Sequence, residues 1–318
     1  GKEDLKRVKC VQDPPLYHVQ NILILHAHLA RIEIPPHLQY IIDGILERVE
    51  CHLTALTDTV GAFQRQDCEA AWHQFMHGHT THLHTAILVS QCVIQGLDKD
   101  DSPLLQIPGF TDREVRYCSS SRNTPCRTVY EFMRHDMSIQ RTLLRGFTDE
   151  QFLDVVALCD RYPQALIEIQ DPLVEGEEDS TVHANDTVTI RAKLTVMRRA
   201  GSVYSPHTPN LPSKKNEIWW VSLSDQRLMC PIEVRRLMPK DARGHDPEKK
   251  SVFSHDASDE LAKDPRVTIY DLKFEFSAPR EGSYTLELSA AVDCYVGCNR
   301  SKVIKMDVRA PVEADASQ

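Results

Sequence analysis

The densest set of chemically reactive side chains in this sequence is a run of histidines: His73, His77, His79, His82 and His84. Two imidazoles four residues apart share one face of a helix, so His73 and His77 could ligate zinc. A catalytic zinc helix needs a glutamate directly after the first histidine, and Gln74 stands there. No cysteine or acidic residue completes a ligand set at the right spacing. We therefore predict no metal site, and interpret the run as a histidine-rich helix surface that gains charge below about pH 6.5.

Motifs for phosphate binding and for nucleophilic catalysis are missing from the sequence. It contains neither G-x-x-x-x-G-K-[ST] nor G-x-G-x-x-G, and no G-x-S-x-G elbow. The paired carboxylates Glu177 and Glu178 lie in an acidic stretch with nothing to hold them in register for acid–base catalysis. We therefore predict a protein that is not an enzyme and binds no cofactor.

The turn Ile107-Pro-Gly-Phe110 is similar to the hairpin of helix-hairpin-helix DNA-binding elements. Those elements use a second glycine so that backbone N–H groups can approach a phosphate, whereas Phe110 and Thr111 follow here. The formal net charge of −9 also disfavours a nucleic-acid partner, which normally meets a basic face. We predict a hairpin that packs against protein, and no nucleic-acid partner.

Composition indicates a soluble globular protein of two or three domains. The chain has 318 residues, of which 41% are hydrophobic and 26% charged. No apolar run approaches the ~18 residues of a membrane span, and the start has no signal peptide. Because Gly1 replaces a starting methionine, we expect the natural protein to extend upstream. The ten cysteines form no C-x-x-C pair, which favours reduced, partly buried thiols over disulfides.

Residues 1–97 are predicted to form a helical bundle. Apolar residues recur every three or four positions from Leu38 to Val60, as on one face of a long helix. Pro35-Pro36 ends the helix before it and starts this one, since proline fits only a first turn. A third apolar stripe runs from Trp72 to Ile94. Three helices with short connections make a bundle.

Residues 98–162 are predicted to form a helix-loop-helix domain, similar to helix-hairpin-helix domains. Three S/T-x-x-E/Q capping boxes open its short helices: Thr111 to Glu114, Thr128 to Glu131, and Thr148 to Gln151. In such a box the threonine oxygen accepts a free N–H of the first turn, and the acid or amide reaches back to the cap.

Residues 163–312 are predicted to form an immunoglobulin-like β-sandwich, so the fold class is multidomain, α followed by β. Apolar and polar residues alternate in seven short segments, which is typical of strands with one buried face. The segments are 164–170, 187–197, 217–224, 228–236, 267–277, 283–292 and 302–309. Loops at 199–216 and 239–266 interrupt them, and the charged composition of 239–266 predicts mobility there. Residues 313–318 form a tail.

Five large side chains are predicted to build the sandwich core: Trp219, Phe274, Phe276, Tyr284 and Tyr295. Alternation places Trp219 inward, in phase with Val221 and Leu223, so Trp220 must lie on the opposite face. We expect the helical domain to cover Trp220, and a partner protein is the alternative.

Six short motifs spread over nearly the whole chain occur in the order of a known family. They are Ser102-Pro-Leu-Leu-Gln-Ile-Pro-Gly109, Leu143-Leu-Arg-Gly-Phe-Thr-Asp-Glu-Gln-Phe152, Tyr162-Pro163, Trp219-Trp220, Phe276-Ser-Ala-Pro279 and Asp293-Cys-Tyr-Val-Gly297. No single motif is specific, but the ordered set resembles the Brl region of the Sec sixty-three family of translocation proteins. Members of that family are J-domain membrane subunits of the protein-translocation complex of the endoplasmic reticulum.

The resemblance implies a helical bundle, a helix-loop-helix domain and a fibronectin type III-like sandwich. The same region also occurs at the ends of spliceosomal-type RNA helicase cassettes, which is the alternative. Two details favour the translocation family. The acidic stretch 171–186 looks like its linker into the sandwich, and this chain lacks a winged-helix or helicase segment upstream of the bundle.

The resemblance further implies a non-catalytic module at the cytosolic face of the endoplasmic-reticulum membrane. Its sandwich would dock on cytosolic loops of the protein-conducting channel and support post-translational import. The luminal chaperone BiP would be reached only through a J domain outside this chain, which has no His-Pro-Asp motif. The family's acidic tail, implied to bind a second translocon subunit, is missing or cut short here after Asp315. We predict that partner contacts lie on loops at one end of the sandwich: Asp225, Gln226, Arg227, Arg280 and Glu281.

Overall fold

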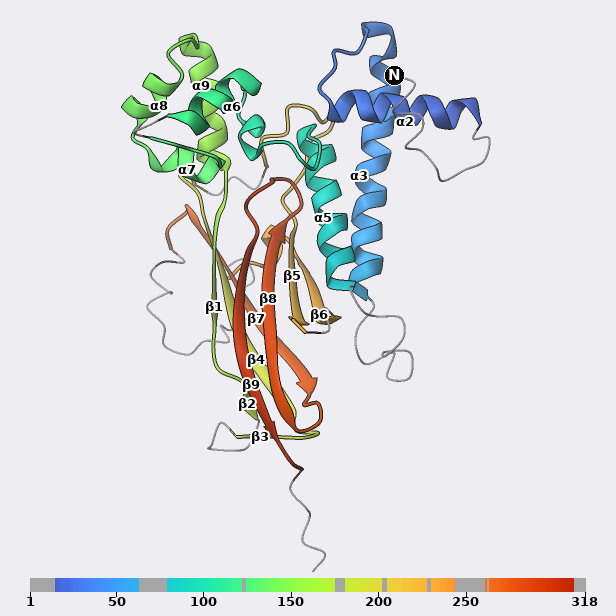
Figure 1. The fold of residues 1–318 in the computed structure, drawn as a ribbon, viewed down its shortest axis with the longest axis vertical. Helices are drawn as coiled ribbons and strands as arrows, with labels where there is room; N and C mark the ends of the chain where they lie inside the picture. Colours follow the sequence, from blue (N-terminus) through green and yellow to red (C-terminus); the bar gives the residue numbers. More distant parts are fainter. Residues whose placement is uncertain are drawn as a thin grey trace, which may run out of the picture.

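The structure is a computed structural model, and its helices precede its β-strands along the chain (Figure 1). It describes residues 15–62, 79–121, 124–174, 181–201, 205–227, 230–243, 261 and 263–311. The prediction of a fold with α followed by β is confirmed at this level.

The first part is a small helical bundle. Its described helices are α2 (Leu16–Leu29), the 3-10 turn η1 (Pro36–Leu38), α3 (Gln39–Ala62) and α5 (His79–Gln95). Helices α3 and α5 run side by side, and α2 crosses one end of α3 (Figure 1). A cluster of Ile24, Ile42, Leu46 and Val93 holds them together. The long helix predicted from the spacing of apolar residues corresponds to α3, and the proline pair starts the turn before it.

The second part consists of short elements: η3 (Pro103–Gln106), α6 (Asp112–Ser120), α7 (Val129–Arg134), α8 (Met137–Leu143) and α9 (Asp149–Arg161). The capping boxes at the starts of α6 and α9 are complete, as predicted. The box at α7 is only half formed. Thr128 Oγ1 accepts the Glu131 N–H at 3.1 Å, but the Glu131 carboxylate accepts the Arg127 N–H at 2.7 Å instead of the cap N–H. The acid therefore reaches one residue beyond its expected partner.

Among the described residues, nine strands form two sheets in the third part. They are β1 (Gln164–Ile169), β2 (Leu173–Val174), β3 (Val182–His183), β4 (Thr187–Met197), β5 (Trp219–Asp225), β6 (Cys230–Leu237), β7 (Val267–Ser277), β8 (Gly282–Val292) and β9 (Arg300–Arg309). In one sheet β4 pairs with β1, β2 and β7, and the other has the order β3-β9-β8-β5-β6. All pairs are antiparallel except β3 with β9.

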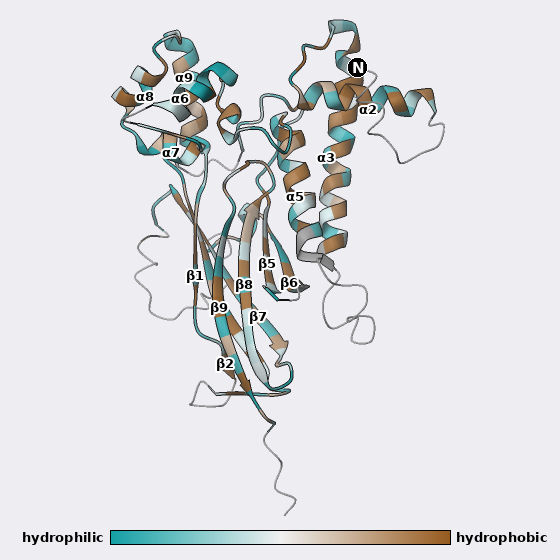
Figure 2. Cartoon of the chain, viewed as in Figure 1, coloured by the Kyte–Doolittle hydropathy of each residue, from teal (hydrophilic) through white to brown (hydrophobic). Residues whose placement is uncertain are grey.

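The seven predicted strands are all present, but the sequence did not indicate β2 and β3. Both lie in the acidic stretch 171–186, which was interpreted as a linker. Each has only two residues, too few to show alternation. In Figure 2, hydrophobic residues (brown) alternate with hydrophilic ones along the strands and along α3 and α5.

The side chains predicted as core lie mostly between the two sheets. Trp219, Phe274 and Tyr295 are fully buried and Phe276 is nearly so. Tyr284 lies near the start of β8 and is only partly buried, and its hydroxyl donates to the Arg280 carbonyl at 2.8 Å.

Residues 199–216 were interpreted from their composition as a linker between strands. Residues 205–216 form a connector that packs between the helical parts and the sandwich. The His207 N–H donates to the Tyr295 hydroxyl at 2.6 Å, and Asn210 Nδ2 donates to the Gln95 carbonyl at 2.9 Å. Polar groups of this connector make hydrogen bonds inside the protein. Composition alone cannot tell such a segment from one whose polar groups face water. In the second predicted loop, Pro239–Asp241 forms the 3-10 turn η4 and Arg243 pairs with Asp271, while 244–260 lie outside the described residues.

Candidate partner-binding site

Helix α5 covers the outer face of the second sheet. Leu83 and Ile87 of α5 pack against Trp220 of β5 and Ala291 of β8. Trp220 is 4% exposed, and its side chain lies opposite that of Trp219, because neighbouring residues of a strand face opposite ways. The helical domain, and not a partner protein, therefore covers the second tryptophan, which was the favoured expectation.

The turn Asp293–Gly297 after β8, which we call the hub turn, is where the three parts of the chain meet. Gln95 Nε2 of α5 donates to the Cys294 carbonyl at 2.7 Å. The Gln106 side chain of η3 makes two hydrogen bonds with Val296, to its carbonyl at 2.9 Å and from its N–H at 2.8 Å. The Tyr162 hydroxyl, at the end of α9, also donates to the Val296 carbonyl, at 3.0 Å.

A buried ion-pair cluster joins the connector to the same turn. Lys215 Nζ lies 2.8 Å from Asp293 Oδ2 and 2.7 Å from Glu50 Oε1 of α3. The side chains of Lys215 and Asp293 are each only 3% exposed. Burial lowers the pKa of Lys215, but Asp293 and Glu50 outweigh that effect and raise it, so the lysine stays charged. The cluster thus links the bundle, the connector and the sandwich.

Sequence reasoning missed the residues that hold the hub turn. Gln95 and Gln106 bind backbone atoms, and amide side chains carry no spacing signal for such contacts. The only hint was that the motifs at 102–109 and 293–297 both belong to the ordered set of the resemblance, and the structure brings these two motifs together.

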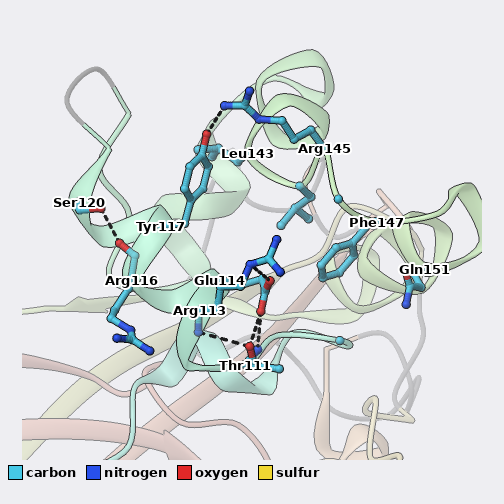
Figure 3. Close-up of a pocket in the computed structure, with 13 residues that line it drawn as sticks. Thr111, Arg113, Glu114, Arg116, Tyr117, Ser120, Leu143, Arg145, Phe147 and Gln151 are labelled. Carbon is cyan, nitrogen blue, oxygen red and sulfur yellow. Dashed lines mark hydrogen bonds and ion pairs between the residues drawn. The ribbon is translucent and has the colours of Figure 1, made fainter.

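The second feature of interest is a cavity of about 840 Å³ in the helix-loop-helix part, which we call the basic cavity (Figure 3). It lies between α6 and the turn that joins α8 to α9. Its walls include Arg113, Arg116 and Tyr117 from α6, and Arg145 and Phe147 from the turn. The Arg145 guanidinium lies 5.7 Å from the centre of the Tyr117 ring and donates a hydrogen bond to its hydroxyl. The two elements therefore meet at the rim of the cavity (Figure 3).

The single acid in the wall of the basic cavity is committed to a helix cap. Glu114 Oε2 accepts the Thr111 N–H at 3.1 Å, as the capping box requires. Partial burial raises the pKa of Glu114, but its hydrogen bonds with Thr111 outweigh this and keep the pKa below the ordinary value. Arg113 Nε lies 3.6 Å from Glu114 Oε1, a loose pair at an exposed arginine.

The hairpin glycine next to this cavity has no open face. Gly109 has φ +75, and a Cβ added there would lie 3.0 Å from the Phe147 ring. The same ring packs edge-on against Phe110, with centroids 6.0 Å apart. Phe147 therefore fills the space over the glycine. The hairpin packs against protein, as the sequence predicted.

The loops predicted to bind a partner lie at the end of the sandwich away from the hub turn, because β8 starts beside them and ends directly before Asp293. Gln226, Arg227, Arg280 and Glu281 are exposed. Asp225 differs, since it is 5% exposed and its Oδ1 accepts the Arg227 N–H at 2.8 Å. Asp225 therefore shapes the turn and does not present its carboxylate. A role of these loops in partner binding stays a prediction.

The histidine run lies partly outside the described residues. His73, His77 and the side chain of His79 are not among them. His82 is exposed. His84 Nε2 lies 3.0 Å from Ser289 Oγ of β8, so this ring also contributes to packing between helix and sheet. Burial lowers its pKa, against the opposing effect of Glu287. Within the described ranges, no three His, Cys, Asp or Glu side chains are grouped as a metal site.

The described cysteines with resolved side chains are free thiols, and all but Cys51 are buried. Burial raises the pKa of Cys159 and of Cys298 to about 12. Neither thiol is therefore set up as a nucleophile. Among the helices that the structure describes, none has the length and apolar character needed to cross a bilayer.

Comparisons with known proteins show that this chain is similar to proteins of two classes. No family model matches. The human "U5 small nuclear ribonucleoprotein 200 kDa helicase" is 25% identical over 301 residues, which is 94% of this chain and 12% of that protein. The "Pre-mRNA-splicing factor brr2" of Schizosaccharomyces pombe is 25% identical over 306 residues, 96% of this chain and 12% of that protein. The human "Translocation protein SEC63 homolog" is 25% identical over 198 residues, 61% of this chain and 26% of that protein.

The chain is thus distantly related to both classes over the same region, and it spans a small part of each relative's length. Among solved structures, a CARDB domain from Pyrococcus furiosus is 13% identical, with a TM-score of 0.26. The match covers 48% of this chain and 96% of that domain. A TM-score this low carries no argument about fold or function.

Proposed function

We propose that this chain is a non-catalytic protein-interaction module in which the helical bundle, the helix-loop-helix part and the sandwich act as one rigid body. The hub turn carries the proposal, because α5, η3, the end of α9 and the connector all bind it. A joint held by hydrogen bonds from four directions resists hinge motion. A partner bound at one end is then held at a fixed position relative to the other end.

We further propose that the parent protein is a subunit of the endoplasmic-reticulum translocation machinery. The sandwich, taken as fibronectin type III-like, would dock on cytosolic loops of the protein-conducting channel and bias that channel toward opening. The ordered motifs and the relatedness to the human translocation protein support this proposal. The net charge of −9 and the hairpin filled by Phe147 also suit a protein partner better than RNA.

The second candidate is an accessory domain of a spliceosomal RNA helicase. One observation favours it, because the alignment with the human helicase covers 94% of this chain, against 61% for the translocation protein. Both candidates share the non-catalytic interaction role and differ in the partner.

A site-specific photo-crosslinker in the full-length parent protein tests the proposal. We would place it at Arg280, on the exposed loop before β8, and at Lys302, an exposed position on β9, as the matched control. We expect Arg280 to crosslink to the protein-conducting channel and Lys302 not to do so. Equal crosslinking from both positions would refute the proposal that this end of the sandwich docks on the channel. Crosslinks to splicing proteins in place of the channel would establish the second candidate.

A further inference from the structure

We propose that the basic cavity binds an acidic, extended peptide segment of a partner protein. This inference rests on the proposed role as a protein-interaction module and adds a second contact to it. The cavity lies in the helix-loop-helix part, whereas the predicted docking loops lie at the end of the sandwich away from the hub turn. A rigid body with contacts at both places could hold two segments of a partner at a set distance.

The charge in the cavity wall is the first reason. Three arginines, Arg113, Arg116 and Arg145, line the cavity together with a single acid, Glu114. Glu114 is committed to its helix cap, so the wall carries an excess of two positive charges in a chain of net charge −9. Arg116 and Arg145 are exposed, and no carboxylate among the described residues forms an ion pair with either of them. Acidic side chains of a partner would complement these groups.

The positioning of the arginines is the second reason. Arg145 is held by the Tyr117 hydroxyl and lies over the Tyr117 ring, which fixes the plane of its guanidinium before any ligand arrives. Arg116 Nε donates to the Asp112 carbonyl at 3.1 Å, which leaves its other N–H groups free to donate. Planar guanidinium groups bind carboxylates with two parallel hydrogen bonds. Their order before binding reduces the entropy that a ligand must overcome.

The floor of the cavity is the third reason. Leu143 and Leu144 are buried beneath it, and Phe147 is half buried at its side. Tyr117 at the rim is 43% exposed. A ligand with acidic groups alone would leave the exposed parts of Tyr117 and Phe147 in contact with water. A peptide that alternates acidic and apolar residues can match both surfaces, because successive side chains of an extended chain point in opposite directions.

Nucleic acid fits the cavity less well. Binding of a nucleic-acid backbone draws on a run of phosphate contacts along a basic face, whereas the arginines here gather in one cavity of an acidic chain. The hairpin glycine that could have offered backbone N–H groups to a phosphate is covered by Phe147. RNA is therefore an outcome of the test and not the proposed ligand.

Fluorescence anisotropy with the purified full chain tests the inference. The probe is a labelled 12-residue peptide of alternating acidic and leucine residues, compared with a single-stranded RNA of equal net charge. We expect Arg116→Glu and Arg145→Glu each to weaken peptide binding at least tenfold. The matched control is Arg134→Glu, the same charge change at an exposed position of α7 outside the cavity, and we expect it to weaken binding less than twofold.

Several results would overturn the inference. They are equal weakening by the control, no binding of the peptide to the wild-type chain, or tighter binding of the RNA with loss in the cavity variants. Arg145→Glu also breaks the contact with Tyr117. If that variant unfolds, the result for Arg116→Glu alone decides the test. The crosslinking from Arg280 is independent of this cavity. Channel crosslinks without peptide binding would refute only the proposal that the basic cavity binds a peptide. Peptide binding without channel crosslinks would refute only the proposal that the sandwich docks on the channel.

Discussion

Replacement of Lys215 by methionine is the sharpest perturbation of the ion-pair cluster that joins the parts. Methionine is an unbranched side chain one atom shorter than lysine, and it carries no charge. Asp293, at 3% exposure, then loses its ion-pair partner, and Glu50, at 24% exposure, keeps part of its hydration. Most of the loss therefore falls on the aspartate.

The expected loss of stability is about 3 kcal/mol at neutral pH. Removing one partner of a buried ion pair costs about 3–5 kcal/mol, and we take the lower end because Glu50 remains partly hydrated. With a urea m-value of about 3 kcal/mol/M, the unfolding midpoint should fall by about 1 M. Lys214→Met changes the same charge at the neighbouring exposed position, and it should stay within about 0.5 kcal/mol of wild type.

The loss should also depend on pH. Burial already raises the pKa of Asp293 in the folded chain, and Lys215 opposes that effect. Without the lysine, the folded pKa of Asp293 rises further above its unfolded value. A carboxyl with a raised folded pKa is most favourable when protonated, so its contribution is present at low pH and is lost as pH rises through the folded pKa. The deficit of Lys215→Met should therefore be smaller at pH 5 than at pH 7.5.

Urea unfolding followed by tryptophan fluorescence measures these differences. Asp293→Asn in the Lys215→Met background should recover part of the loss, because the amide is neutral and its oxygen can still accept the Ile218 N–H. A midpoint for Lys215→Met equal to that of Lys214→Met would refute the reasoning. A deficit that grows as the pH falls would refute the assignment to Asp293.

Two other variants test the remaining packing. Gln106→Leu removes both hydrogen bonds to Val296 and should lower the free energy of unfolding by about 2 kcal/mol. Amide hydrogen exchange in the hub turn should become faster, and unchanged exchange would contradict the role of this side chain. Gly109→Ala should lower the thermal midpoint, at a cost of about 1–3 kcal/mol, because its φ is +75 and the new Cβ would press on Phe147 at 3.0 Å. Gly146→Ala is the control, since its nearest neighbour is at 3.8 Å, and an equal loss there would contradict the clash.

The strands were predictable from sequence because one face of each is buried. Alternation along 267–277 and 283–292 predicted β7 and β8 almost to the residue. The strands β2 and β3 were missed, because pairing of two residues depends on partners far away in the chain and leaves no local pattern. The capping boxes of α6 and α9 were predictable for the opposite reason, since all their partners lie within three residues.

The packing of the connector could not be predicted, because a polar segment can be either solvated or hydrogen-bonded inside the protein. Lys215 meets Glu50, which is 165 residues away, and no local pattern records that contact. The basic cavity was missed for the same reason. Its arginines come from α6 and from the turn before α9, and only the folded chain brings Arg116 and Arg145 to one cavity.

The central claim is that the three parts form one rigid body joined at the hub turn. Pulsed electron–electron double resonance, which measures the distance between two spin labels, can test it directly. The spin labels would be carried by unnatural amino acids at two exposed positions, Glu47 of α3 and Glu281 beside β8. The account predicts a single narrow distance distribution that broadens in a Lys215→Met, Gln106→Leu double variant. A broad or two-peaked distribution in the wild-type chain would contradict it.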